Sequence, residues 1–157
     1  MKLTPEMIKK KIKKPFDFVE RMGLRVIELE PRSVKLSVPL KGNENHIGTM
    51  YAGALFTIAE IPGGALFLTT FDVSRFYPVI KEMTIRFIKP AKTDVTIGMV
   101  MSVSEAKRIV SEAEKNGKAE YVLEGEIKDT NEEVVAVSQG IYQVRIINPI
   151  VDPNVEP

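Results

Sequence analysis

The sequence predicts an α+β fold in which an antiparallel sheet wraps around one long central helix. Residues 50–68 form a long apolar segment with a single charged residue, Glu60. On both sides of this segment, apolar and polar residues alternate with the period of two that is typical of half-buried strands. A helix that is apolar all round needs a sheet around it and a partner on the far side.

The chain begins with a predicted helix. Thr4-Pro5-Glu6 has the residue order of a helix start: a capping threonine, a proline in the first turn and an acidic residue behind it. This helix is expected from about Pro5 to Lys14, and a second short helical turn over residues 16–22. Residues 1–22 would then be an N-terminal helical segment. Its lysines are interpreted as a solvated helix face, because the net charge of the chain is only +1.

The strands are predicted from alternation and turn residues. Residues 24–30 and 34–40 form a hairpin, and a helix follows from Ala52 to Thr70. The later strands are expected at residues 83–87, 95–103, 119–127 and 134–146. Residues 104–115 are compatible with a short helix or with a polar, bulged strand end. The whole chain, 1–157, is expected to be one domain, with a frayed tail over 148–157.

Composition excludes several classes of function. A net charge of +1 gives no general attraction to nucleic acid or to an anionic membrane. The chain has no cysteine and one histidine, which excludes thiolate chemistry and leaves no plausible zinc cluster, so neither a metal nor a separate cofactor is expected. No apolar signal-peptide region follows the basic start, and a cytoplasmic location is expected.

Residues 50–71 are long enough to span a bilayer. Glu60 lies at their centre, where a charge costs roughly 2.5–3.5 kcal/mol on insertion. The sequence Pro62-Gly63-Gly64 follows at once. A buried helix of a soluble protein is therefore the better interpretation, with no membrane partner.

Glu60 is the main candidate for chemistry. A carboxylate in an apolar setting is costly unless it is paired, and its pKa should rise, which suits a general base at neutral pH. The alternative is that backbone groups beside Pro62 satisfy it. A helix that starts near residues 51–53 offers free N–H groups to a developing oxyanion, and Gly53 permits close approach.

Residues 45–60 resemble the signature of hotdog-fold acyl-CoA thioesterases of the phenylacetate-pathway type. Asn45, Gly48 and Gly53 match that signature, and Glu60 takes its acidic position. The turn at residues 87–91 also resembles the turn that follows the family's second strand. The family's histidine is replaced by Tyr51; the single histidine, His46, lies five residues earlier and is not its equivalent.

The resemblance implies a hotdog fold and hydrolysis of an acyl-CoA thioester. It makes Glu60 the general base or nucleophile, the Gly53 N–H the oxyanion donor, and Asn45 the positioning residue. The substrate-binding residues that it implies are His46, Gly48, Tyr51 and Ala52. Coenzyme A enters only as part of the substrate. The site of such proteins lies between subunits, so a homodimer or a dimer of dimers is expected.

Other interpretations stay open. Tyr51 in the histidine position favours a non-catalytic hotdog module that binds acyl-CoA or another apolar ligand. A hydratase or dehydratase is weaker, because those enzymes usually pair a histidine with a carboxylate. Asn45 could simply cap its turn, and Tyr51 could be an interface aromatic. Gly63-Gly64 is interpreted as allowing close helix packing.

Overall fold

The computed structural model describes residues 4–13 and 17–147. The helices are α1 (Pro5–Lys13), α2 (Asp17–Arg21), α3 (Ala52–Thr70) and α4 (Val103–Asn116). The strands are β1 (Arg25–Glu30), β2 (Ser33–Val38), β3 (Phe76–Phe87), β4 (Val95–Val100), β5 (Lys118–Lys128) and β6 (Val134–Ile146). The tail predicted to fray, 148–157, lies outside the described residues.

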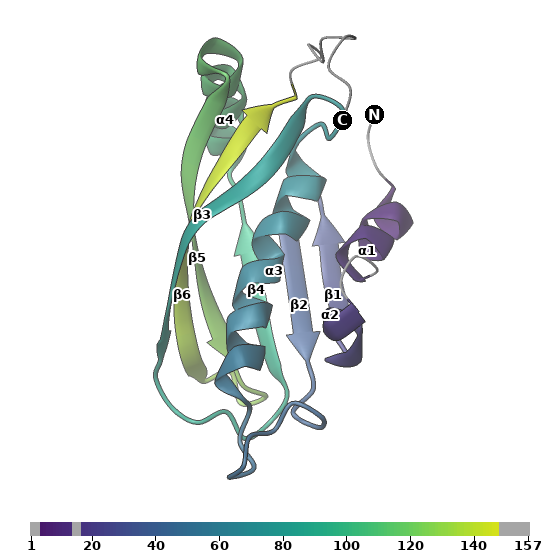
Figure 1. Ribbon diagram of the computed structural model, residues 1–157, viewed down its shortest axis with the longest axis vertical. Coiled ribbons are helices and arrows are strands. Elements are labelled where there is room, and N and C mark those ends of the chain that lie inside the picture. Colours follow the sequence, from purple (N-terminus) through teal and green to yellow (C-terminus); the bar gives the residue numbers. More distant parts are fainter. Residues whose placement is uncertain (1–3, 14–16, 148–157) are drawn as a thin grey trace, which may run out of the picture.

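The six strands form one sheet in the order β1-β2-β4-β5-β6-β3, and each neighbouring pair is antiparallel. The sheet curves, and α3 lies along its concave side, with β3 curling past the helix (Figure 1). This architecture confirms the predicted hotdog fold. β1 and β3 are the two edge strands, and β3, with 12 residues, pairs only with β6 among the described strands.

The core lies between α3 and the sheet. Ile58 and Leu66 of α3 are fully buried, as are Leu36, Ile97 and Ile127 on the inward faces of β2, β4 and β5. Burying one such side chain stabilises a fold by about 1.5–3 kcal/mol. The β5 strand shows the alternation directly, since its residues are exposed and buried in turn along most of its length.

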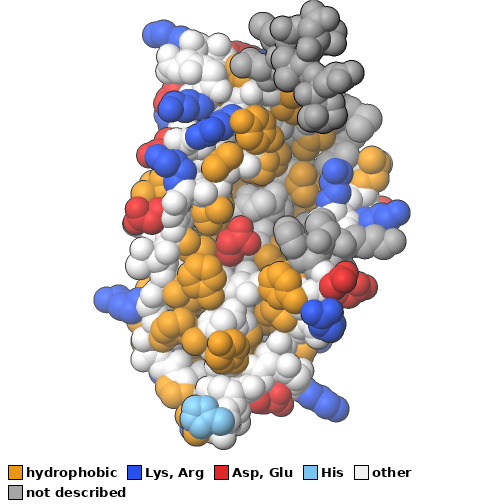
Figure 2. Space-filling view, viewed as in Figure 1, with side chains coloured by type: hydrophobic (Ala, Val, Ile, Leu, Met, Phe, Trp, Pro, Cys, Tyr) orange, Lys and Arg blue, Asp and Glu red, His pale blue; other side chains and the backbone are white. Residues whose placement is uncertain are grey.

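One side of α3 is left uncovered by the part of the chain that the structure describes, residues 4–13 and 17–147. Between residues 53 and 68 the exposed or half-buried positions recur every three or four residues: Gly53, Phe56, Thr57, Glu60, Ile61, Gly64 and Leu68. That spacing is a single helical face, called here the outward stripe. Figure 2 views the molecule from this side and shows hydrophobic side chains around one acidic group. The partner expected from the sequence on this far side of the helix stays a prediction.

By length and composition α3 could cross a membrane, but half of its most apolar window is buried inside the fold. Its bounds are those predicted from the sequence. The predicted first helix is also confirmed, and the Thr4 hydroxyl accepts a hydrogen bond from the Met7 N–H at 3.3 Å.

The segment after β4 settles an open alternative and corrects one boundary. Residues 103–116 form a helix rather than a bulged strand end. The Ser102 hydroxyl caps it by accepting from the Glu105 N–H at 3.0 Å, and Gly117 ends it with a φ of 79°. The predicted strand at 95–103 therefore stops at Val100, because the Ser102 cap has already begun the helix. In contrast, β3 begins at Phe76, earlier than the alternation indicated.

The packing of α3 can be tested by replacing a buried isoleucine and an exposed isoleucine with alanine. Ile58→Ala should lower the free energy of unfolding by about 2–5 kcal/mol, because Ile58 is fully buried against the sheet. Ile27→Ala, at a side chain that is 56% exposed, should change it by no more than about 0.5 kcal/mol. Urea unfolding measures both. Equal losses in the two variants would contradict this account of the core.

Candidate functional site

Glu60 lies half-buried at the middle of the outward stripe. Within residues 4–13 and 17–147, its carboxylate has no recorded hydrogen bond or ion pair. Burial raises the pKa of the Glu60 carboxyl above its ordinary value, as the sequence predicted. The alternative in which backbone groups beside Pro62 satisfy the charge therefore has no support. An ionisable group without a structural partner is a candidate for chemistry.

The N-terminus of α3 offers unused hydrogen-bond donors. Tyr51 is the capping residue, and its side chain makes no capping bond. The N–H groups of Ala54 and Leu55 both donate to the Tyr51 carbonyl, at 3.0 and 3.1 Å. No acceptor among the described residues is recorded for the N–H groups of Ala52 and Gly53. These two donors lie at the positive end of the helix and can stabilise a negatively charged oxygen.

The turn before α3 is held by Asn45. Its side-chain oxygen accepts from the N–H groups of Ile47 and Thr49, both at 3.1 Å, and its amide donates to the Thr49 hydroxyl at 2.9 Å. Gly48 has a φ of 79°, a conformation that favours glycine. These bonds support the interpretation of Asn45 as a turn cap. Its direct contact with a substrate stays a prediction.

Two clefts flank the start of α3. One of about 310 Å³ lies between the Asn45 turn and residues 87–91, and Ala52 lines it. The other, of about 450 Å³, lies beside α2, and Tyr51 and Gly53 line it. The predicted site residues are thus divided between two clefts. His46 is exposed, and it lines neither cleft; nor do Gly48 and Glu60.

Tyr51 lies directly over Gly53. A Cβ added to Gly53 would come within 3.0 Å of the Tyr51 ring. The sequence predicts that a substrate approaches Gly53 closely. On the side of the missing Cβ, the Tyr51 ring of the same chain makes that approach instead. The N–H of Gly53 remains the part of this residue that is open to a ligand.

Glu60 and Gly53 do not meet in one chain. They lie seven residues apart on one helical face, a separation of about 10 Å at 1.5 Å per residue. A carbonyl group that accepts from the Gly53 N–H is therefore out of reach of the Glu60 carboxylate of the same protomer. A site that uses both groups needs two copies of the chain.

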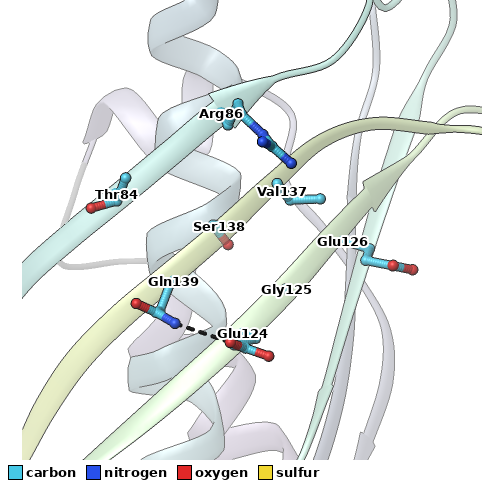
Figure 3. Close-up of a pocket in the computed structure, with 8 residues that line it drawn as sticks. All are labelled: Thr84, Arg86, Glu124, Gly125, Glu126, Val137, Ser138 and Gln139. Atoms are coloured by element: carbon cyan, nitrogen blue, oxygen red, sulfur yellow. Dashed lines mark hydrogen bonds between the residues drawn. The ribbon is translucent and has the colours of Figure 1, made fainter.

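A further hollow, of about 470 Å³, lies on the other face of the sheet. Figure 3 shows Thr84 and Arg86 of β3, Gln139 of β6 and Glu124 of β5 around it, with α3 behind the strands. The Gln139 side chain donates to Glu124 at 3.0 Å. None of the predicted site residues lines this hollow, and it lies apart from the Glu60 face.

Sequence reasoning missed one neighbour of Glu60. The hydroxyl of Tyr142, on β6, donates to the Glu60 carbonyl at 3.4 Å. The two residues lie 82 positions apart, so no local pattern connects them. The one sequence signal was the Gly63-Gly64 pair. A Cβ on Gly63 would collide with the Tyr142 ring, which confirms close packing at Gly63, whereas Gly64 faces open space.

Comparison with known proteins agrees with this structure. Residues 5–144 match DUF4442, a domain of unknown function. The chain belongs to this family. No curated protein matches it. Among solved structures it is similar to PA5026 from Pseudomonas aeruginosa, a protein of unknown function described as a probable thioesterase. The two are 50% identical with a TM-score of 0.90, over 94% of this chain and 99% of that one.

Two more distant structures share the fold of this DUF4442 protein. A putative thioesterase from Shewanella oneidensis is 18% identical with a TM-score of 0.74, over 90% of this chain and 96% of that one. A mutant of thioesterase PA1618 from Pseudomonas aeruginosa is 16% identical with a TM-score of 0.71, over 94% and 97%. The predicted membership of the hotdog-fold thioesterase superfamily is thereby confirmed.

The raised pKa of Glu60 predicts a pH-dependent stability. The folded chain holds the Glu60 proton more tightly than the unfolded chain, whose pKa is near 4.5. The stability that this contributes is present below that value and is lost as the pH rises through the raised folded pKa. Glu60→Gln should therefore raise the melting temperature at neutral pH, and the gain should disappear near pH 4. Exposed Glu126→Gln is the control; a gain that persists in acid would contradict the prediction.

Proposed function

We propose that this protein is an acyl-CoA thioesterase in which Glu60 acts as general base or nucleophile. The observation that carries the proposal is a half-buried carboxylate, without a recorded partner among the described residues, on the apolar outward stripe. An apolar face suits an acyl chain, and a carboxylate of raised pKa can take a proton at neutral pH. The 50% identity with a probable thioesterase supports the same class of reaction.

The proposed chemistry uses two parts of α3. A water attacks the thioester carbonyl carbon while the Glu60 carboxylate takes its proton. The N–H groups of Gly53 and Ala52 hold the oxygen that becomes negative. The C–S bond then breaks, and the departing thiolate of coenzyme A takes the proton from Glu60. If Glu60 instead attacks directly, the same donors serve and water hydrolyses the resulting anhydride.

We also propose that the active form is at least a homodimer. The Glu60 of one protomer would act on a thioester held at the Gly53 N-terminus of the other, because the two groups of one chain are too far apart. The outward stripe and the unpaired edge of β3 both suit a second copy. A two-fold axis would bury both surfaces and build two equivalent sites. His46, Gly48 and Tyr51 would then border the substrate, with Asn45 shaping their turn.

Thiol release from a panel of acyl-CoAs tests the mechanism. Glu60→Gln should lower kcat by about 10²–10⁴-fold, the usual contribution of a positioned general base. Glu126→Gln, the same change on the exposed outer face of β5, should hydrolyse at the native rate. Native activity in Glu60→Gln would refute the assigned role. Acyl-CoA binding by the native chain without turnover, at several pH values, would favour the non-catalytic binding module.

Light scattering after size-exclusion chromatography tests the proposed homodimer. Phe56→Asp places a charge on the outward stripe and should shift the protein toward monomer, with loss of hydrolysis. Val122→Asp is the control, because Val122 is 53% exposed on the opposite face of the sheet. It should leave the dimer intact. A Phe56→Asp protein that stays dimeric would contradict this placement of the interface.

A further inference from the structure

Tyr142 has a fixed place under the helix that carries Glu60. Its ring is 3% exposed, on the inward face of β6, and its hydroxyl donates to the Glu60 carbonyl at 3.4 Å. Burial and the nearby Glu60 charge both raise the pKa of the Tyr142 phenol. The phenol therefore keeps its proton at neutral pH and stays a hydrogen-bond donor.

Two glycines make the room for this ring. A Cβ on Gly63 of α3 would collide with the ring and its hydroxyl, and one on Gly140 of β6 would approach ring carbon Cε2 to 2.5 Å. Neither glycine has a positive φ, so space rather than backbone conformation explains both. The Tyr121 ring stacks on Tyr142, with centroids 5.7 Å apart and planes 20° apart. The ring is thus confined by both glycines and by Tyr121.

The helix is weakened where Tyr142 meets it. Pro62 has no N–H, so the Ile58 carbonyl loses its usual helical partner next to Glu60. A bond from β6 to the Glu60 carbonyl ties this turn to the sheet. The direction of the Glu60 side chain depends on the backbone of that turn, and a small displacement of a reacting group is costly in rate.

We propose that Tyr142 is a positioning residue, which anchors α3 at Glu60 and so sets where the carboxylate is presented. This inference rests on the proposed thioesterase function. Tyr142 lies beneath the helix and does not line the clefts beside residues 51–53. Removing the Tyr142 hydroxyl should therefore slow the chemical step and leave substrate binding unchanged.

Tyr142→Phe keeps the ring in its confined place and removes only the hydroxyl. It should lower kcat about five- to ten-fold with KM unchanged, the loss expected of one hydrogen bond that matters in the transition state. The matched control is Tyr121→Phe, an equally buried tyrosine in the same stack with no recorded bond to Glu60. It should keep the native kcat. Equal kcat values in native, Tyr142→Phe and Tyr121→Phe proteins would overturn the inference, as would a loss that falls on KM.

A second readout does not depend on activity. Amide hydrogen exchange at Ile61, Gly63 and Gly64 should be faster in Tyr142→Phe than in Tyr121→Phe, because only the first change releases the Glu60 turn. Equal exchange in the two variants would overturn the anchoring role even if no thioester is hydrolysed. If the native chain hydrolyses nothing while the exchange differs, the proposed function fails and the anchor stands.

Discussion

The packing of α3 into the curve of the sheet is the interaction on which the other features depend. It buries one side of an apolar helix and leaves the outward stripe, with Glu60 at its middle, facing away from the core. A carboxylate on the buried side would lose its water and would have to be paired or hydrogen-bonded there. On the uncovered side it needs only to tolerate partial loss of water. The orientation of α3 about its axis therefore leaves the Glu60 carboxylate partly desolvated and still accessible to a ligand.

The electrostatics around Glu60 are dominated by desolvation rather than by charge pairs. The pKa of the Glu60 carboxyl rises because of burial. The Glu60 charge raises the pKa of the Tyr142 phenol, but the neutral phenol does not shift the pKa of Glu60 in return. The phenol is still neutral when Glu60 titrates, so it places no charge on the carboxylate. A second protomer on the outward stripe would remove more water and raise the carboxyl pKa further. In the proposed dimer, assembly would therefore make the carboxylate more basic.

The sequence predicted the fold well because its strongest signals are local. The α3 bounds follow from one apolar run, and β5 and β6 follow from alternation. The end of β4 was missed because the apolar pattern runs on through Val103, where a serine cap overrides it. At the candidate site, Glu60 was proposed from its lone charge in an apolar run and from its position in the family signature. Tyr142 was missed because its contact with Glu60 comes from the packing of α3 against β6, which no spacing near either residue encodes.

The adjacent glycines of α3 show how one short sequence serves two sides of the helix. Gly63 faces the sheet, and its missing side chain is replaced by the Tyr142 ring. Gly64 lies one turn after Glu60 on the outward stripe, and a Cβ there would meet nothing within 4 Å among the described residues. Larger side chains would expel the tyrosine at one position and narrow the approach to the carboxylate at the other. The helix tolerates two glycines because packing against the sheet, rather than intrinsic propensity, holds it.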